Sequence, residues 1–237
     1  MLLSQEEVDN IRQNDSIAAK YIRPLLGSEE FINNNPSYCL WLKDSTANDR
    51  LNSPEIQNRM ILVKKMRLNS TREATRKLAE TPYLFAEIRQ TDQPYLLIPR
   101  VSSEQRKFVP LGYIGSDVIC KDLAFMLPNA SLYDFGLLTS SFHNAWMRTV
   151  CGRLKSDYRY SNTIVYNNFP FPEKITAVQK TKIETAAQQI LNARTAEEKL
   201  CTEQEQKYSL ATLYAAGNMP ADLLKAHNAL DKAVDAA

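Results

Sequence analysis

Apolar residues in the first third of the chain recur mainly at the spacing of amphipathic helices. Ser4 followed by Glu7 matches a capping box, which predicts that a short helix begins there. Ser53 before Pro54 combines a favoured N-cap with a favoured first helical residue, which predicts the start of a longer helix. Gly27 is a residue type that often ends a helix. The helices expected in this region follow Ser4 and cover residues 16–26, 54–68 and 71–80.

The middle of the chain changes to short runs rich in β-branched and aromatic residues, separated by polar turns. These runs predict strands over residues 83–88, 95–99, 108–114, 118–127 and 163–166. Residues 132–150 instead repeat apolar side chains at helical spacing and predict one long helix that ends before Gly152. The pattern after residue 172 is helical throughout, with helices expected over residues 175–193, 203–213 and 221–236.

Together these elements predict an α+β fold. A helical entry segment should precede a small mixed or antiparallel sheet with a long helix, and an all-helical segment should end the chain. The run Phe-Pro-Phe-Pro at 169–172 interrupts both periodicities, so we place a domain boundary directly after it. The expected domains are therefore residues 1–172 and 173–237.

Composition restricts the class of protein further. The chain has 237 residues, of which 44% are hydrophobic and 24% are charged, as in ordinary globular domains. It has no apolar run long enough to span a bilayer and no signal-peptide pattern at its start, so we expect no membrane association. The four cysteines are widely spaced, at positions 39, 120, 151 and 201, which favours reduced thiols in the cytoplasm over a zinc site.

Positive charge is concentrated in residues 59–77, which hold seven basic residues and one acidic residue. A basic helical surface of this kind can follow the phosphates of a nucleic acid. The candidate phosphate contacts in this segment are Lys64, Lys65 and Arg67. The alternative is a helix face that is simply solvated, and a charge run by itself does not decide between the two.

A second basic segment, residues 148–161, reads RTVCGRLKSDYRYS and mixes cations with tyrosines. Its candidate phosphate contacts are Arg148, Arg153, Lys155, Tyr158 and Tyr160. In an extended segment Asp157 and Arg159 would point the same way, and there Arg can bind guanine while Asp can accept from cytosine. We therefore predict that these two residues read bases. The alternative is a surface ion pair beside core tyrosines.

A polar turn between two predicted strands, residues 99–108, is another candidate reading loop. Its base-reading candidates are Ser102, Ser103, Glu104 and Arg106. Such a loop can enter a DNA groove, although a hairpin tip without any ligand has the same composition. No catalytic motif accompanies these segments, because the sequence has no P-loop, no G-x-S-x-G and no H-E-x-x-H.

Residues 33–38 read NNNPSY, one residue away from the Asn-Pro-Pro-Tyr box of DNA methyltransferases that modify exocyclic amines. In those enzymes the box ends a buried strand of a sheet that also binds S-adenosylmethionine at a Gly-rich turn. Here the preceding residues 28–34 are polar, and no Gly-rich turn comes before them. We therefore expect residues 33–38 to be a turn that leads into a strand.

Four parts of the sequence resemble the C-terminal part of MmeI-like enzymes, which are type IIL restriction–modification proteins. The segments are KYIRPLLGSEEFINN with YCLWL within 20–42, IPRVSSEQRKFVPLGYI at 98–114, LYDFGLLTSSFHNAWMRTVCGRLKSDYRYS at 132–161 and IVYNNFPFP at 164–172. The resemblance spans nearly the whole chain, and residues 132–172 are its most specific part. It implies a polypeptide in which a nuclease, a helical connector and an adenine methyltransferase precede a target recognition domain and a C-terminal helical segment.

The resemblance implies that residues 1–172 form a DNA target recognition domain and residues 173–237 a C-terminal helical domain. The implied function is sequence-specific recognition of duplex DNA, which positions an adenine for methylation by a methyltransferase domain of the same polypeptide. That domain would bind S-adenosylmethionine, so we expect no cofactor and no catalysis in this fragment alone. Its parent would be an adenine-specific DNA methyltransferase, with or without endonuclease activity. The alternative is a module that packs on the rest of the enzyme without touching DNA.

Overall fold

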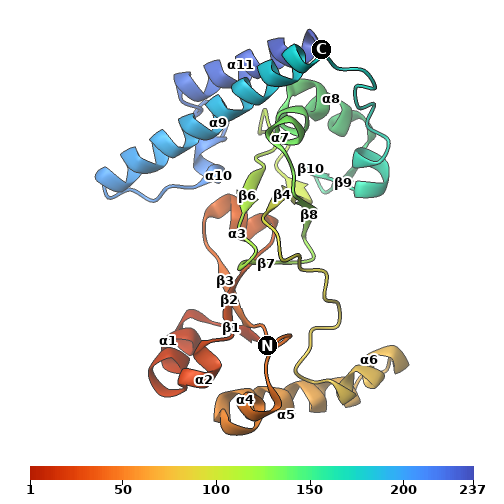
Figure 1. Cartoon of the computed structure of the whole chain (residues 1–237), viewed down its shortest axis with the longest axis vertical. Coiled ribbons are helices and arrows are strands. Elements are labelled where there is room, and N and C mark those ends of the chain that lie inside the picture. The colour runs from red at the N-terminus through yellow and green to blue at the C-terminus, as the bar shows by residue number, and fades with distance from the viewer. The chain divides into compact units, whose positions relative to one another are not determined.

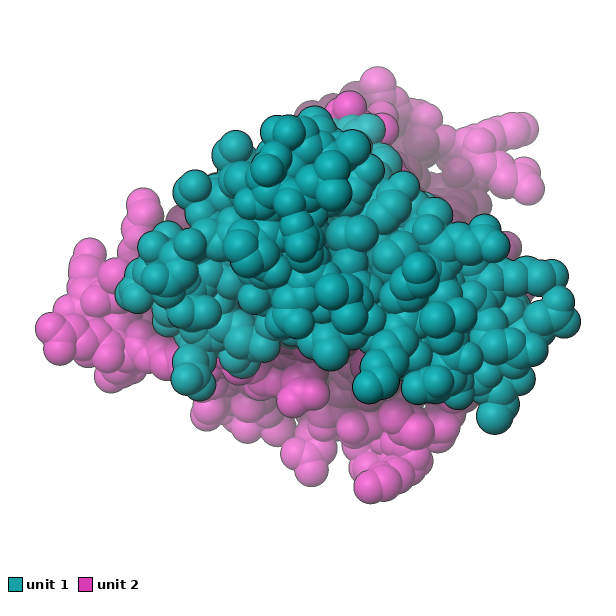
Figure 2. Space-filling model, turned by 90° about the horizontal axis from the view of Figure 1, so that it is seen from below, with its two compact units in different colours: residues 1–25, 36–92, 117–119 teal, residues 26–35, 93–116, 120–237 magenta.

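The computed structural model describes residues 1–237, and their contacts divide the chain into two compact units. Figure 1 shows the helices and strands, and Figure 2 shows the two units in different colours. The first unit consists of residues 1–25, 36–92 and 117–119, and the second of residues 26–35, 93–116 and 120–237. The chain therefore passes between the units several times.

The first unit combines short helices with a four-stranded sheet. Its elements are β1 (Leu2–Leu3), α1 (Gln5–Asn14), α2 (Ser16–Ala19), β2 (Ile22–Leu26), β3 (Ser37–Leu40), α4 (Ala47–Asn52), α5 (Pro54–Leu68), α6 (Glu73–Lys77), the 3-10 turn η1 (Leu78–Glu80) and β7 (Ile119–Cys120). The strand order is β1–β3–β2–β7, and β3 pairs antiparallel with both β1 and β2. Apolar side chains of α1, α5 and the sheet share one core, which includes Val8, Leu40 and Ile56.

Helix starts in the first unit follow the predicted capping residues. The Ser4 hydroxyl accepts from the backbone N–H of Glu7, whose carboxylate accepts from the backbone N–H of Ser4, so the capping box is confirmed. Ser53 caps α5 and donates from its hydroxyl to the Asp15 carboxylate at 2.6 Å. The helix over 54–68 is also confirmed, and most of 71–80 is helical as α6 and η1.

The helix predicted over residues 16–26 is wrong. Only α2 is helical there, and the chain then extends into β2, where Pro24 lies opposite Tyr38 of β3. Proline explains the change, because it cannot donate the helical backbone bond and it disfavours the helical conformation of the residue before it. Gly27 therefore ends no helix, and instead precedes α3 (Ser28–Asn33).

The second unit holds two small sheets and the C-terminal helices. Its elements are α3, β4 (Tyr95–Pro99), β5 (Val101–Ser102), β6 (Gly112–Ile114), β8 (Ala124–Pro128), α7 (Leu132–Thr139), α8 (Ser141–Val150), β9 (Gly152–Leu154), β10 (Asp157–Arg159), the π-helical turn η2 (Asn162–Tyr166), α9 (Ala177–Glu203), α10 (Leu210–Leu213) and α11 (Ala221–Asp235). Strands β6–β4–β8 form one antiparallel sheet, and β5–β10–β9 form the other. Helix α9 packs along α7 and α11 (Figure 1). Gly136 permits close approach there, because a Cβ at that position would lie 2.7 Å from Ile183 Cγ2.

The long helix predicted over residues 132–150 is interrupted. Ser140 takes an extended conformation between α7 and α8, and its hydroxyl caps α8 by accepting from the backbone N–H of His143 at 3.2 Å. Serine supports such a break because its side chain can replace the helical backbone bonds that an N-terminus leaves unmade. The apolar periodicity continues through the break, and for that reason one helix was expected where two exist.

The strand predicted over residues 163–166 is also wrong, because these residues belong to the π-helical turn η2. Val165 is buried, and its carbonyl accepts from Trp146 Nε1 at 2.9 Å. The β-branched residues there therefore fill the core instead of pairing in a sheet. Two further predictions fail, since no strand forms over 83–88 and the helix over 203–213 is reduced to α10.

The α+β fold class is confirmed, with small sheets and a helical C-terminal segment. The domain boundary after residue 172 stays a prediction. Helices α9 and α11 pack within the same compact unit as the β6–β4–β8 and β5–β10–β9 sheets, so contacts alone do not mark that boundary. None of the helices combines the length and the apolar composition that crossing a bilayer requires.

Candidate nucleic-acid interface

Two separate candidate segments of the sequence form neighbouring strands in the second unit. Strand β5 begins the candidate loop at 101–107, and strands β9 and β10 form a hairpin in the basic segment. Tyr158 of β10 lies opposite Ser102 of β5 on one side and opposite Arg153 of β9 on the other. We call residues 101–107 and 152–159 together the β5–β10–β9 surface.

The extended conformation predicted for β10 is present. Side chains alternate along a strand, so Asp157 and Arg159 share one side while Tyr158 faces the other. Two cations cover the Tyr158 ring, with Arg153 Cζ 4.0 Å and Arg148 Cζ 5.6 Å from its centroid. Arg159 is exposed and Asp157 is half-buried, which leaves both side chains accessible at this surface.

A hollow of about 350 Å³ with both polar and apolar lining residues lies between the β5–β10–β9 surface and α3. Its lining includes Glu29, Asn33, Ser102, Ser103, Arg106 and Asp157. Burial lowers the pKa of the Arg106 guanidinium, and the Asp157 carboxylate opposes that shift, so the two groups interact. Two buried atoms of the lining residues, Ser102 Oγ and Arg106 Nε, have no hydrogen-bond partner within the chain. Because buried polar atoms usually have a partner, the hollow is suited to a polar ligand or to water.

The structure corrects the roles predicted for two residues of the second basic segment. Tyr160 is only 5% exposed, and its hydroxyl lies 3.0 Å from His143 Nε2, so it cannot reach a phosphate. Arg148 uses its guanidinium internally, donating to the backbone carbonyls of Arg106 and Lys107. The structure therefore gives Arg148 a structural role: its guanidinium holds the 101–107 loop in place.

The β9–β10 hairpin carries two accessible cations of this surface, Arg153 and Lys155. Arg153 Nη1 donates to the Ser156 carbonyl at 2.6 Å and lies 3.3 Å from a Glu104 carboxylate oxygen. Lys155 is exposed at the turn, in the left-handed backbone region with φ of 56°. Arg153 thus links the hairpin to the 101–107 loop, while the Lys155 ammonium is left toward solvent.

In the first unit, Arg67 does not occupy the solvated position that its charge suggested. It is 6% exposed, and its guanidinium donates to the carbonyls of Leu78, Thr81 and Leu84 at 2.6–3.0 Å. These bonds fasten the chain after η1 onto α5. The phosphate role predicted for Arg67 is therefore wrong, because the guanidinium is inside the unit.

The rest of the basic segment 59–77 also offers fewer free cations than its sequence indicates. The engaged side chains are Arg59 with Glu7 and Glu55, Arg76 with the carbonyls of Ser70 and Thr71, and Lys77 with Glu73. Lys64, Lys65 and Arg72 remain exposed. Arg76 and Lys77 nevertheless stay exposed beside these partners, so Arg59 and Arg67 are the two basic side chains of this segment that are turned inward.

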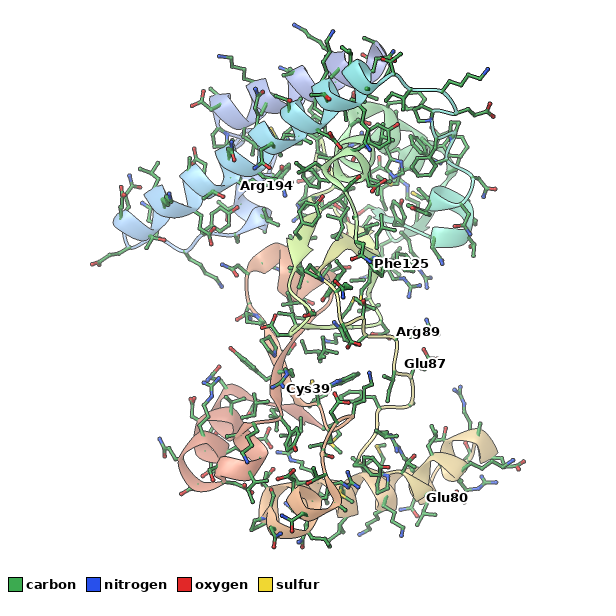
Figure 3. The ribbon with its side chains drawn as sticks, in the orientation of Figure 1. Cys39, Glu80, Glu87, Arg89, Phe125 and Arg194 are labelled. Carbon is green, nitrogen blue, oxygen red and sulfur yellow. The ribbon has the colours of Figure 1, made fainter.

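A buried polar cluster that no sequence motif indicated joins the C-terminal helices to residues 108–111. Figure 3 labels Arg194 on α9, and its guanidinium donates to the Leu111 carbonyl and to the Tyr214 hydroxyl. The same hydroxyl lies 2.9 Å from His227 Nε2, and the His227 ring stacks on Phe108 with centroids 4.0 Å apart. The C-terminal helices therefore hold the segment that follows the 101–107 loop. These residues are far apart in the sequence, so spacing could not have revealed the cluster.

The NNNPSY segment forms the predicted turn into a strand. Asn34 ends α3 in the left-handed conformation with φ of 49°, and β3 begins at Ser37. The side chain of Asn34 donates to the Tyr208 carbonyl at 3.3 Å. The segment is thus a helix C-cap, and it does not have the strand-end geometry that a catalytic box requires.

Two family models match consecutive parts of the chain: the MmeI target recognition domain over residues 1–173 and the MmeI C-terminal domain over residues 175–237. The chain is 40% identical over 217 residues to DNA methyltransferase A of Bacillus subtilis (strain 168), covering 92% of this chain and 24% of that protein. It is 42% identical to the type IIL restriction–modification enzyme MmeI, solved in complex with DNA, with a TM-score of 0.91 over 99% of this chain and 30% of that chain. The chain therefore spans about a quarter to a third of the length of these relatives.

Proposed function

This chain belongs to the MmeI family, and from that membership we propose that it binds duplex DNA and recognises a specific sequence. The observation that carries the proposal is the β5–β10–β9 surface. It joins two polar segments that are distant in the sequence into one exposed strand surface with hydrogen-bonding side chains. A two-stranded ribbon or a loop of this size fits the major groove, where base edges are distinguishable. The similar MmeI structure is a complex with DNA, which agrees with this assignment.

We assign base reading to the side of β10 that carries Asp157 and Arg159. Arg can donate two bonds to guanine O6 and N7, and Asp can accept from cytosine N4. Ser103, Glu104 and Arg106 extend the reading surface, because they continue β5 into the loop beside Asp157. Ser102 is buried and stands behind them, where its hydroxyl can bind only a group or water that enters the hollow.

We assign phosphate contacts to Arg153 and Lys155 at the hairpin tip, with Tyr158 packed beneath Arg153. Contacts to the DNA backbone fix the register of a protein on the duplex and add little sequence information. Arg148 supports DNA binding indirectly, because its guanidinium holds the 101–107 loop in position. Lys64 and Lys65 belong to α5 in the first unit, apart from this surface.

The parent polypeptide is proposed to be an adenine-specific DNA methyltransferase that uses S-adenosylmethionine, and the catalytic box and cofactor site are assigned to a part outside this chain. The residues present do not fit the cofactor, because NNNPSY caps a helix and no Gly-rich turn from strand to helix precedes it. Endonuclease activity of the parent is proposed only by analogy with the family, since no residue of this chain bears on it. The role proposed for this chain is therefore to place the target adenine, with methyl transfer carried out elsewhere.

Binding of fluorescent random duplexes at low salt tests the proposal, followed by selection of bound sequences. We expect non-specific binding that weakens steeply with salt, and an enriched motif when the chain is tested within its full-length parent. The competing function is a module that packs on the enzyme without touching DNA. It predicts no shift of any duplex and no enriched motif, and that result would remove the DNA-recognition proposal.

A further inference from the structure

Helix α5 carries apolar side chains on its outer side as well as toward the core. Ile56 is fully buried and Met60 packs against the same core, as expected for the inner face. The outer side nevertheless exposes four large apolar side chains: Ile61 at 65%, Leu62 at 53%, Met66 at 64% and Leu68 at 53%. Four large apolar side chains exposed on one side of a helix form a surface that a partner can cover.

The four side chains form one connected patch. Ile61, Lys65 and Leu68 lie at positions i, i+4 and i+7, and Leu62 and Met66 form the adjacent i, i+4 pair. Contiguous apolar patches of this kind mark interaction surfaces more often than singly exposed residues do. The patch has one cation at its centre, which is Lys65, whereas Lys64 lies on the flank.

The helix is held rigidly in the first unit. Arg59 donates to the carboxylates of Glu7 and Glu55 and, at 3.2 Å, to the carbonyl of Leu2. Arg67 fastens the other end of the helix to the chain beyond η1. The outer face is therefore preorganised, which lowers the entropic cost of docking a second surface on it.

We propose that the outer face of α5 docks the part of the parent polypeptide that lies outside these 237 residues, and that this face does not follow DNA phosphates. The inference rests on the proposed function, which makes this chain one portion of a longer methyltransferase. The chain spans 24% and 30% of its relatives, so most of such a polypeptide is available as the occupant within the same molecule. A tethered occupant has a high effective concentration, so a patch of four apolar side chains can hold it.

The chemistry of the face defines its occupant. It should present apolar side chains to Ile61, Leu62 and Met66, and a carboxylate where the Lys65 ammonium reaches the rim. DNA fits poorly, because an apolar patch gains nothing from phosphates and both Arg59 and Arg67 of this helix are engaged within the unit. Lys64 stays a candidate phosphate contact, and Lys65 is reassigned to the docking face.

A photoactivatable benzophenone amino acid in place of Leu62, in the full-length parent bound to DNA, tests the docking face directly. We expect an intramolecular cross-link from position 62 to residues outside this segment, identified by mass spectrometry. The same probe in place of Val178, which is also 65% exposed but lies on α9, is the matched control and should give no such product. Cross-links from position 62 to DNA or to a second protein molecule, or none at all, would overturn the proposal.

The double substitution Leu62→Glu with Met66→Glu gives a second readout in the same full-length protein. Loss of docking should make proteolysis between this segment and the rest of the polypeptide at least about tenfold faster, while Val178→Glu leaves the rate unchanged. An unchanged cleavage rate in the double variant would contradict docking. The two proposals can fail separately, because intramolecular cross-links in a parent that binds no DNA would remove only the DNA-recognition function.

Discussion

Arg153 stacks on Tyr158, with its Cζ atom 4.0 Å from the centre of the ring, while its Nη1 reaches the Ser156 carbonyl and the Glu104 carboxylate. One guanidinium thus joins the β9–β10 hairpin to the 101–107 loop. Stacking on the ring fixes the plane of the Arg153 guanidinium. The N–H donors of a guanidinium form a rigid fork, so fixing the plane also fixes the directions of its hydrogen bonds, which is not so for a Lys ammonium. Arg153 therefore combines a positioning role with a charge that is available to DNA.

Replacing Arg153 with Ala should weaken binding to every duplex by a similar factor. If Arg153 neutralises one phosphate, the slope of log K against log salt should fall by about one unit. Salt titrations of duplex binding measure this slope. Lys199→Ala, which removes an exposed cation from α9, is the control and should leave the slope unchanged. A variant that keeps its slope but prefers another sequence would show that Arg153 reads bases.

Replacing Arg67 with Met should destabilise the first unit without changing the salt dependence of DNA binding. The substitution leaves the carbonyls of Leu78, Thr81 and Leu84 without their buried donor. We expect the free energy of unfolding in urea to fall by about 2–4 kcal/mol. Lys64→Met, at an exposed position on the same helix, should change it by less than about 0.5 kcal/mol. Equal stability of the two variants would contradict the structural role of Arg67.

Local signals in the sequence identified most helices, because capping residues act on their own neighbours. Ser4 and Ser53 marked helix starts correctly, and their hydroxyls make the expected bonds. The error at 16–26 came from giving Gly27 more weight than Pro24, although proline restricts the backbone more strongly. The error at 163–166 had another cause, because burial of Val165 against the core outweighs the strand preference of its residue type.

The candidate site could be predicted only in part from the sequence. Asp157 and Arg159 were expected to share one side because alternation is a local property of a strand. The pairing of Tyr158 with Ser102 was not predictable, since it depends on contacts between distant segments that periodicity does not encode. Burial of Arg67 was missed for the same reason, and burial of Tyr160 was foreseen only in the alternative of core tyrosines, because composition records a charge or a hydroxyl but not its partners.

Acid should destabilise the second unit through its buried histidines. Burial lowers the pKa of His143 from 6.5 to about 4, and that of His227 to about 3. Both pKa values are lower in the folded state, so protons favour the unfolded chain. The stability that the neutral rings contribute is complete above pH 6.5 and is lost as pH falls toward 4. Between pH 7 and 5 each histidine should contribute a loss of about 2 kcal/mol.

His143→Gln should remove close to half of that loss, because glutamine cannot be protonated in this range. Urea denaturation at a series of pH values gives the slope of the free energy of unfolding, which separates this effect from any constant destabilisation by the substitution. His227→Gln is the matched variant and should remove the other half. Identical slopes for the wild type and both variants between pH 7 and 5 would contradict neutral buried rings.

The isolated chain should not bind S-adenosylmethionine measurably in calorimetry. The reason is that Asn35 follows the left-handed cap of α3 and does not end a buried strand, as a catalytic box would. Asn35→Ala should therefore leave the heat of mixing unchanged. Micromolar binding that disappears in Asn35→Ala would show that NNNPSY is a cofactor-associated box after all.

Asp157→Ala should weaken binding to the correct DNA site by about 1–3 kcal/mol and relax discrimination at one base pair only. The side of β10 that carries Asp157 also carries Arg159, and the two could read one G·C pair from its two bases. Removing either residue leaves the polar groups of the other unpaired in the interface, which is costly. Changing both together should therefore change which base is preferred, and not simply reduce affinity.

A surface ion pair is the competing account of Asp157 and Arg159, and it makes a different prediction. An exposed pair contributes less than about 1 kcal/mol to stability and nothing to sequence choice. The structure adds a third account, in which Asp157 serves only to orient Arg106. Both residues line the hollow, and the Asp157 carboxylate acts on the half-buried Arg106 guanidinium. If Asp157 acted only on Arg106, Asp157→Ala and Arg106→Ala should alter preference at the same base pair, and Arg159→Ala should not. Selection of bound random duplexes by the full-length parent, for the wild type and each variant, distinguishes the three accounts. A motif that stays unchanged at every position in all variants would exclude base reading by β10, even if the domain still binds DNA through Arg153 and Lys155.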